Sequence, residues 1–426
     1  MLELDQLTPR EQIVNIMGRI YRQGLTSLSG GNISVFDEND NIWITPTAVD
    51  KGNLKPDDIV RFNAAGEYFG NQRPSSEYPF HWAIYKNRSD IKAIVHAHSP
   101  ALIAFSIAGK VPDTAISPIA MEVCGDIGYA AYASPGSQRL GESIAEVFKN
   151  GHDVVILENH GIVAGGPDLI TAFQRVETLE YTARTLIHAN GLGIVKKIES
   201  DALIQAWMNP KFETKYNPDL KDSSQIFEIK QQLIRIIRRA YQQHLFFSTS
   251  GCASMRLDDQ RFIITPHKID RLSLREDDLV VIGEQERQTP HPPSRMVALH
   301  RAIYHQQPGV NAIMTAQPPF CTAFAVTGKI IDTRSIPESY MLLRTIQQAS
   351  LLDALMNPQI VASLISELSP ALLLENLGIL VTGKNILQAY DRLEVSEFSA
   401  RSLVEASALG GLKPINPEEI ARLNWL

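Results

Sequence analysis

The chain has 426 residues, of which 44% are hydrophobic, and a formal net charge of −7 at pH 7. This length exceeds the usual size of one domain, so we expect two domains of about 200 residues each. Lysine and arginine are scattered along the chain rather than clustered, which argues against nucleic acid or an anionic membrane as a partner.

The three cysteines are Cys124, Cys252 and Cys321, and their spacing is neither disulfide-like nor metal-like. Such sparse use suits a reducing compartment, so we expect a cytoplasmic location. The first residues lack the basic and apolar regions of a signal peptide, and no uninterrupted run of about 18 apolar residues follows. The sequence therefore predicts no membrane-spanning segment.

A long-period internal repeat decides how every motif is interpreted. Residues 43–60 read WITPTAVDKGNLKPDDIV, and residues 263–280 read IITPHKIDRLSLREDDLV, without a gap between them. The similarity continues in three further pairs of segments, which begin at His81 and His300, at Ala104 and Ala323, and at Glu158 and Glu375. We therefore predict a tandem duplication.

In chain order, each copy opens with an amphipathic helix. In the first copy Thr8 is the predicted N-cap, Glu11 completes a capping box, and Gly24 ends the helix. Short apolar runs at 92–98 and 154–157 predict strands, and each leads into a helical pattern. This alternation predicts an α/β layer structure for each copy.

The segment that joins the copies is polar and contains Asn-Pro pairs, which are typical of a connector. We predict a first domain at 1–195, a linker at 196–224 and a second domain at 225–426.

Three histidines of the first copy form a candidate metal site. His96 and His98 lie two residues apart in a predicted strand, so their side chains share one face. His160 follows the strand at 154–157, where a turn begins. Three imidazoles with one open position are the arrangement of catalytic zinc. A His-x-His pair alone is more often a pair of structural or surface histidines.

The second copy is an internal control for this interpretation. His81 is retained there as His300, so we interpret His81 as structural. The candidate site residues are lost together: His96, His98, His160, Glu77, Ser76 and Asn32 correspond to Thr315, Gln317, Leu377, Met296, Arg295 and Cys252. Joint loss is expected for residues that share a function, although independent drift of two copies also changes many positions.

Five ordered motifs of the first copy point to a family: SGGNIS at 29–34, ITPT at 44–47, PSSE at 74–77, HAH at 96–98 and NHG at 159–161. They resemble the class II aldolase/adducin family, and within it the L-fuculose-phosphate aldolases most closely. The resemblance implies an α/β fold with two tandem class II aldolase/adducin-like three-layer α/β/α domains. The second domain is then a degenerate copy without metal ligands.

The resemblance also implies roles for individual residues. It places zinc, or Mn²⁺, Fe²⁺ or Co²⁺, on His96, His98 and His160, with Glu77 beside the metal as ligand or general acid/base. A phosphate-binding set is implied as well, and it consists of Gly31, Asn32, Thr47, Ser75 and Ser76. A Gly-Gly-Asn turn also occurs without any ligand, so plain turn structure remains the alternative.

The implied function is that of a metal-dependent lyase in carbohydrate metabolism, which cleaves a sugar phosphate by retro-aldol chemistry through an enediolate. Glu77 favours cleavage, because the related pentulose-phosphate 4-epimerases usually carry aspartate there. Two positions depart from the family: Ala48 stands where glycine is frequent, and residues 116–121 lack the tyrosine that the aldolases place opposite the metal. Dehydration or 4-epimerisation of a sugar phosphate therefore stays open, as does decarboxylation or another enediolate reaction on an unphosphorylated substrate.

Members of this family commonly assemble as fourfold rings with the site between subunits. We therefore expect a homodimer that forms a pseudo-tetramer of domains, in which the second copy completes the pocket of the first. A non-catalytic, adducin-like scaffold is the alternative of another class, and it is the preferred interpretation of the second copy alone. His267 and His291, both beside prolines, are interpreted as surface histidines.

Overall fold

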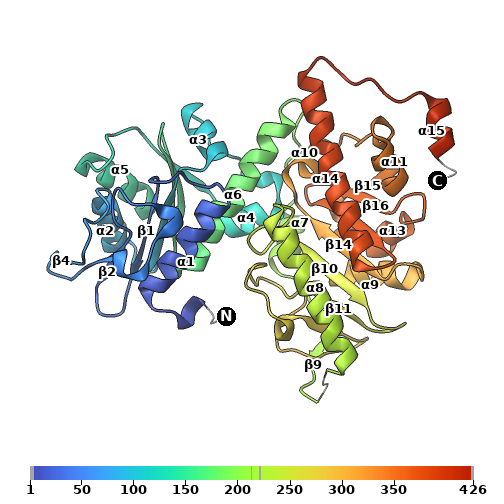
Figure 1. Cartoon of the computed structure of the whole chain (residues 1–426), viewed down its shortest axis with the longest axis horizontal. Coiled ribbons are helices and arrows are strands. Elements are labelled where there is room, and N and C mark those ends of the chain that lie inside the picture. The colour runs from blue at the N-terminus through green and yellow to red at the C-terminus, as the bar shows by residue number, and fades with distance from the viewer. Residues whose placement is uncertain (1–3, 213, 220–221, 424–426) are drawn as a thin grey trace. The chain divides into compact units, whose positions relative to one another are not determined.

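The computed structural model describes residues 4–212, 214–219 and 222–423, which form two compact units (Figure 1). Unit 1 ends at Arg184, inside helix α6 (Leu169–Ala189). Unit 2 continues from Thr185 and also includes Ala115–Pro118. This division lies before residue 195, and the domain limits drawn from the sequence stay a prediction.

Among the described residues of unit 1, eight strands form one sheet in the order β4-β3-β2-β1-β5-β8-β7-β6. Neighbouring strands run antiparallel except β6 and β7, which run parallel. The strands are β1 (Asn32–Phe36), β2 (Ile42–Ile44), β3 (Val60–Phe62), β4 (Tyr68–Phe69), β5 (Ala93–Ala97), β6 (Ile127–Ala130), β7 (Val154–Leu157) and β8 (Gly161–Gly166).

Helices cover both faces of this sheet (Figure 1). The helices besides α6 are α1 (Pro9–Arg22), α2 (Tyr78–Asn87), α3 (Pro100–Ile107), α4 (Pro118–Cys124) and α5 (Gln138–Lys149). Val95 packs with α1 and α6, whereas its neighbour Ile94 packs with α2 and α5 on the opposite face. Alternating strand residues therefore enter two separate cores. The predicted three-layer α/β/α architecture is confirmed.

The first helix begins as the sequence predicts. The Thr8 side chain accepts a hydrogen bond from the Glu11 backbone, and the Glu11 carboxylate accepts one from the Thr8 backbone at 2.9 Å. This capping box satisfies backbone N–H groups that have no partner inside the helix.

Unit 2 repeats the topology of unit 1, which confirms the duplication. Its strands follow the order β15-β16-β17-β14-β10-β11-β12-β13, which is the same arrangement written from the other end, and β9 adds an edge beside β13. The strands are β9 (Lys215–Tyr216), β10 (Cys252–Arg256), β11 (Phe262–Ile264), β12 (Val280–Ile282), β13 (Glu286–Arg287), β14 (Ala312–Ala316), β15 (Ile346–Ala349), β16 (Ala371–Leu374) and β17 (Gly378–Gly383).

The helices of unit 2 follow those of unit 1, with one replacement and with one additional helix before the first and one after the last of them. They are α7 (Asp201–Met208), α8 (Ser224–Gln242), α9 (Val297–Gln306), α10 (Pro319–Thr327), α11 (Pro337–Leu343), α12 (Leu351–Met356), α13 (Pro358–Ser363), α14 (Ile386–Ala408) and α15 (Pro417–Leu423). The short pair α12 and α13 replaces the single helix α5. Pro358 separates them, because proline disfavours a helical conformation at the residue before it.

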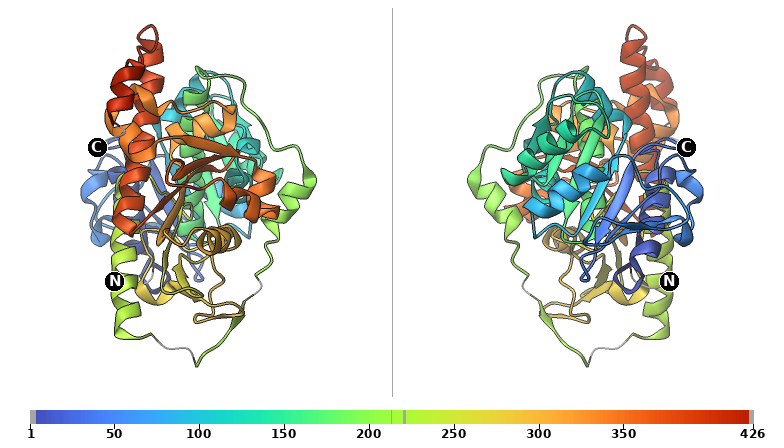
Figure 2. Two further views of the ribbon diagram at one scale, coloured as in Figure 1. Left: turned by 90° about the vertical axis from the view of Figure 1, so that its right-hand side faces the viewer. Right: turned by 90° about the vertical axis from the view of Figure 1, so that its left-hand side faces the viewer.

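The described residues of the segment predicted as a linker belong to unit 2 and include regular structure. The segment contains α7 and β9, and Figure 2 shows it running along the outside of this unit. Lys215 donates its backbone N–H to the Gln285 carbonyl at 2.8 Å, and Asn217 donates to the Arg287 carbonyl at 2.9 Å. These bonds continue the sheet of unit 2 by one short strand.

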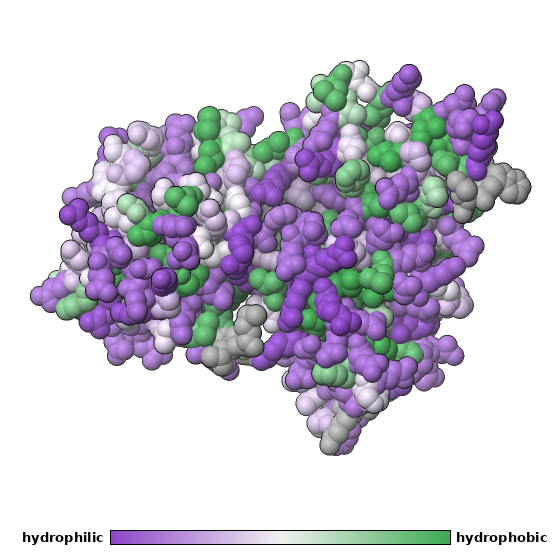
Figure 3. All heavy atoms as spheres, viewed as in Figure 1, coloured by the Kyte–Doolittle hydropathy of each residue, from purple (hydrophilic) through white to green (hydrophobic). Residues whose placement is uncertain are grey.

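The surface view gives a mixed pattern of side chains. Hydrophobic residues form small, separate groups among hydrophilic ones on the face drawn in Figure 3. Within residues 4–212, 214–219 and 222–423, no helix combines the length and hydropathy that crossing a membrane requires.

Candidate metal centre

Three histidine side chains converge beside the end of β5 in unit 1. His96 lies in β5 and is buried, His98 follows directly after this strand, and His160 lies in the turn between β7 and β8. One ring nitrogen of each lies within 4.8 Å of the other two. The structure therefore brings together the three residues that the sequence proposes as metal ligands.

The ring of His96 is oriented by the backbone. Its Nδ1 lies 2.9 Å from the Ile162 carbonyl, which can only accept, so Nδ1 carries the proton and Nε2 keeps a lone pair. This Nε2 lies 3.0 Å from Nε2 of His98. Two nitrogens of a tetrahedral zinc site, each about 2.0–2.1 Å from the ion, are separated by about 3.3 Å. The spacing of the two rings therefore fits one shared cation.

Burial keeps the imidazoles of His96 and His98 neutral. It lowers the pKa of His96 well below its ordinary value, and the charges of His98 and His160 lower it further. Burial also lowers the pKa of His98 to about 4, with a further contribution from His160. Neutral imidazole is the form that binds a metal ion, so both rings are ready to coordinate at pH 7.

Glu77 completes the cluster from the start of α2. Its Oε2 lies 3.3 Å from Nε2 of His96, and its Oε1 lies 3.4 Å from Nε2 of His160. Asn32 donates from Nδ2 to Oε2 at 2.8 Å, whereas Oε1 is buried without a hydrogen-bond partner. A buried carboxylate oxygen that lacks a partner, next to three imidazoles, fits a divalent cation.

A directed chain of hydrogen bonds holds Asn32 in place. Because Asn32 already donates to Glu77, its Oδ1 accepts from Nε2 of His81. Nδ1 of His81 then accepts from the hydroxyl of Ser34 at 2.7 Å, and Ser34 in turn accepts from Tyr85 at 2.7 Å. Burial lowers the pKa of His81 to about 3, so this ring stays neutral. His300 makes the corresponding bond to Ser254 in the second copy, which fits a structural role for both histidines. In the first copy His81 also orients the Glu77 carboxylate through Asn32.

The glycine turn before β1 is shaped by the histidines. Gly31 has a φ of +68°, and a Cβ there would lie 2.6 Å from the His96 carbonyl oxygen. A Cβ at Gly30 would lie 2.9 Å from Nδ1 of His98. Any larger residue would displace the backbone or the ring, so the Gly-Gly pair is a requirement of the site.

The proposed phosphate-binding residues lie on adjoining segments. The backbone N–H of Thr47 bonds to Arg73, and that of Ser75 bonds to Thr45, at 3.0 and 3.1 Å. Ser75 is buried, whereas Thr47 and Ser76 are exposed. Gly31 and Asn32 reach the same cluster through the pairing of β1 with β5. The side chain of Asn32 is engaged with Glu77 and His81.

Two further residues of this cluster escaped the sequence analysis. Lys51 is 2% exposed and donates from Nζ to the Pro46 carbonyl at 2.6 Å. Thr26 is 9% exposed, and its Oγ1 is buried without a hydrogen-bond partner. One signal was present for the first of them, because a basic residue stands at the same place in both copies, as Lys51 and Arg271.

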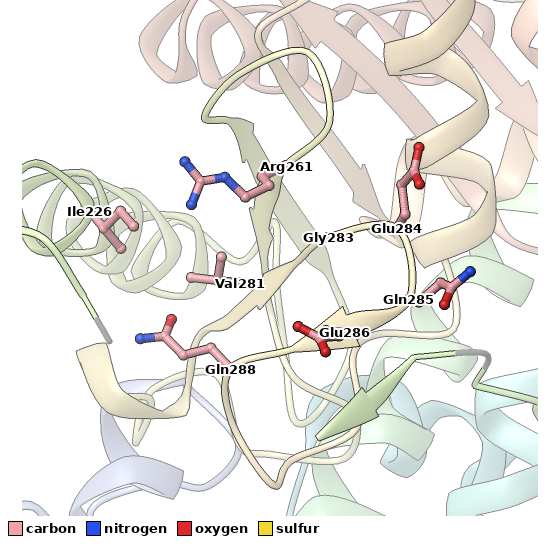
Figure 4. Close-up of a pocket in the computed structure, with 8 residues that line it drawn as sticks. All are labelled: Ile226, Arg261, Val281, Gly283, Glu284, Gln285, Glu286 and Gln288. Atoms are coloured by element: carbon pink, nitrogen blue, oxygen red, sulfur yellow. The ribbon is translucent and has the colours of Figure 1, made fainter. Parts of the chain in front are cut away.

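A separate cavity of about 360 Å³ lies in unit 2 (Figure 4). It is lined by Ile226, Arg261, Val281, Gly283, Glu284, Gln285, Glu286 and Gln288. These residues belong to α8 and to the β11–β13 region, and none of them corresponds to a residue of the histidine cluster. This cavity is therefore not the second copy of the metal site.

Fold and site together define an α/β domain that is present twice and that can hold a metal ion in its first copy. The sequence profile of the Class II Aldolase and Adducin N-terminal domain matches residues 11–187 and 231–404. The chain therefore belongs to the class II aldolase/adducin family.

The similar proteins include enzymes of two kinds. L-fuculose phosphate aldolase of Methanocaldococcus jannaschii is 38% identical over 175 residues, which cover 41% of this chain and 93% of that protein. 3-oxo-tetronate 4-phosphate decarboxylase of Haemophilus influenzae is 33% identical over 193 residues, or 44% and 91% of the two chains. A solved L-fuculose 1-phosphate aldolase is 31% identical, with a TM-score of 0.43, and covers 49% of this chain and 96% of that one. Family and relatives support an aldolase-type lyase rather than a scaffold.

Proposed function

We propose that the first copy is a metal-dependent lyase that cleaves a sugar phosphate by retro-aldol chemistry. The observation that carries this proposal is the Glu77 carboxylate, whose Oε1 is buried without a hydrogen-bond partner and lies 3.4 Å from His160. Relatives named as L-fuculose phosphate aldolase support a sugar phosphate as substrate.

The donor set supports zinc as the metal, because three imidazoles are its usual catalytic ligands, and Mn²⁺, Fe²⁺ or Co²⁺ accept the same donors. When bound to His96, His98 and His160, such an ion supplies Lewis-acid stabilisation of the enediolate left by carbon–carbon cleavage. His96 is fully buried, whereas His98 and His160 are partly exposed.

Glu77 would shuttle one proton: it takes the proton that the hydroxyl of the aldehyde half releases as the carbon–carbon bond breaks, and it gives this proton to the enediolate carbon. Asn32 holds Oε2 at 2.8 Å, so Oε1 is the oxygen that stays available to carry the proton. The same oxygen takes the proton back in the condensation direction. The chain Tyr85, Ser34, His81 and Asn32 fixes the carboxylate in one orientation for this step.

Decarboxylation is the second candidate reaction. It is favoured by the relatives named 3-oxo-tetronate 4-phosphate decarboxylase, one of them 33% identical over 193 residues. Loss of carbon dioxide beside a carbonyl also breaks a carbon–carbon bond and leaves an enediolate, so His96, His98, His160 and Glu77 serve both reactions. Dehydration and 4-epimerisation of a sugar phosphate remain alternatives of the same chemistry.

Metal content tests the proposal first. Chain purified without chelator should carry about one divalent ion. The His96→Ala/His98→Ala variant should carry none, whereas Thr315→Ala/Gln317→Ala, the matched change in the second copy, should keep it. Absence of bound metal in the wild type, even after zinc is supplied, would overturn the enzyme proposal and leave the scaffold.

Product analysis then separates the reactions. The metal-loaded chain is incubated with ketose 1-phosphates and with a 3-oxo sugar-acid phosphate. Release of an aldehyde supports the aldolase, release of carbon dioxide supports the decarboxylase, and neither product would contradict both.

We further propose that two chains form a homodimer with four domain copies in a pseudo-tetramer. A monomer in light scattering at assay concentration would contradict this assembly. A cytoplasmic location is supported by three cysteines that are buried and unpaired, because such thiols persist in a reducing compartment.

A further inference from the structure

Lys51 is a buried cation where two candidate ligand-binding segments meet. Its backbone N–H bonds to the Leu28 carbonyl at 2.8 Å, just before the Gly30-Gly31 turn. Its Nζ bonds to the Pro46 carbonyl at 2.6 Å, between Thr45 and Thr47. Only 2% of this residue is exposed. The lysine therefore joins the glycine turn to the segment that carries Thr47.

The ammonium group of Lys51 has unused donors. An ammonium carries three N–H bonds, and the Pro46 carbonyl accounts for one. Burial lowers the pKa of Lys51 to about 8, and the negative charge of Glu77 acts in the opposite direction. The group is thus mostly charged at pH 7 but poorly solvated, which is a favourable arrangement for binding an anion.

Thr26 gives an independent indication at the same turn. Its Oγ1 is buried without a hydrogen-bond partner. A Cβ at Gly30 would lie 3.0 Å from this oxygen, and a Cβ at Gly31 would lie 3.2 Å from it. A hydroxyl that faces the glycine turn and lacks a partner is a second donor available to a ligand.

The second copy, which lacks the metal ligands, satisfies the corresponding groups internally. Arg271 stands in the place of Lys51 and donates to three backbone carbonyls, those of Gly251, Pro266 and Ile269, at 2.7, 3.3 and 2.8 Å. Phe246 stands in the place of Thr26, and its ring lies against Gly251. Where the metal ligands are absent, the cation has backbone partners and the space beside the turn is filled.

We propose that Lys51 determines specificity for a phosphorylated substrate: its ammonium, assisted by the Thr26 hydroxyl, holds the phosphate dianion at the Gly30-Gly31 turn. This inference rests on the proposed function and adds a residue to it. A buried cation discriminates by charge, so an unphosphorylated sugar is bound weakly at this end of the site. The hydroxyls and backbone groups of the turn alone would not make that distinction as strongly.

The test uses the metal-loaded full chain and inorganic phosphate as the probe. Lys51→Met removes the charge and keeps the length of the side chain, and Lys55→Met, at an exposed lysine of the same loop, is the matched control. Calorimetry should show phosphate binding to the wild type and to Lys55→Met, and binding weaker by about tenfold or more to Lys51→Met. Equal affinity in Lys51→Met and the wild type would overturn the inference, as would no binding to the wild type.

Two further measurements keep the inference separate from the proposed function and from folding. The metal content of Lys51→Met should equal that of the wild type. A wild type that binds no metal would contradict the proposed function and not the role of Lys51. Thr26→Val keeps the shape of its side chain and should also weaken phosphate binding. If Lys51→Met fails to fold, unchanged phosphate affinity in Thr26→Val would overturn the inference. With a phosphorylated substrate, Lys51→Met should raise KM, whereas Lys55→Met should leave KM unchanged.

Discussion

The two copies differ most at the end of the sheet where the first copy gathers its histidines. In unit 1, His98 faces His96 there, and buried polar atoms of Thr26 and Glu77 lack hydrogen-bond partners. In unit 2, Gln317 replaces His98, and both polar atoms of its amide have partners: Oε1 accepts from Ser250 and Gly251, and Nε2 donates to Leu377 at 2.9 Å. Buried polar groups without partners lower stability. Their presence at this end of the first copy, where the second copy carries the apolar Phe246 and Met296, therefore indicates function there.

Behind this site the two copies are the same. Tyr85, Ser34 and His81 form a hydrogen-bonded chain in unit 1, and Tyr304, Ser254 and His300 form it again in unit 2. The chains diverge only at their ends, since His81 reaches Asn32 whereas His300 reaches Thr315 at 3.1 Å. The hydrogen bonds that both copies share therefore serve the fold. The bond from His81 to Asn32, which occurs in the first copy, serves the candidate metal site.

The largest expected effect concerns Glu77. Glu77→Gln keeps the shape of the side chain but removes its acid/base capacity, so kcat should fall by about 10²–10⁴-fold while metal content stays unchanged. Met296→Leu, the matched change in the second copy, should leave kcat unchanged. Steady-state kinetics and elemental analysis on the same preparations check both. Wild-type kcat in Glu77→Gln would show that another group transfers the proton.

A smaller effect, equal for His81 and His300, is expected from acid. Burial lowers the pKa of His81 and of His300 from 6.5 to about 3. Below pH 6.5 the unfolded chain therefore binds protons that the folded chain does not bind. The free energy of unfolding should fall as pH decreases from 6.5 towards 3, by about 1.4 kcal/mol per pH unit for each histidine.

Urea titrations at pH 7 and pH 5 measure this loss of stability. His81→Gln and His300→Gln should each remove about half of the pH dependence that the pair produces, whatever their effect on stability at pH 7. Unequal effects of the two variants would mean that the shared hydrogen-bonded chain is not equivalent in the two copies.

The smallest effect is expected at a strained backbone position. Ala48 and its counterpart Lys268 have φ values of 56° and 57°, in the left-handed region that favours glycine. Ala48→Gly and Lys268→Gly should each relieve strain of about 1 kcal/mol, partly offset by the greater freedom of glycine in the unfolded chain. Thermal unfolding should show a small rise or no change. A clearly lower melting temperature in either variant would contradict the proposed backbone strain.

The sequence predicts those parts of the molecule in which hydrophobic or functional residues recur at a regular spacing. Alternation such as that of Ile94 and Val95 places strands between two cores, and the two-residue spacing of His96 and His98 puts both rings on one face. The loss of the same residues from the second copy singles out Glu77 and His160.

Other features depend on contacts that no local pattern reports. Lys51 stands in the polar stretch DKGN and resembles a surface lysine, and only its bonds to Leu28 and Pro46 reveal its burial. The strand at 215–216 is two residues long and forms by pairing with β13, so its composition indicates only a connector. The family resemblance placed Asn32 among the phosphate-binding residues. Its bonds to Glu77 and His81 join residues 45 and 49 positions apart, so no local pattern reports them.

The serine at position 250 makes the divergence of the second copy difficult to reverse. It occupies the place of Gly30, where any Cβ would lie 2.9 Å from the histidine ring that the first copy packs there. A histidine restored at 317 would therefore collide with Ser250, and Ser250→Gly alone would leave Gln317 without one of its partners. Each of these single steps is unfavourable, so a histidine at position 317 requires both changes together.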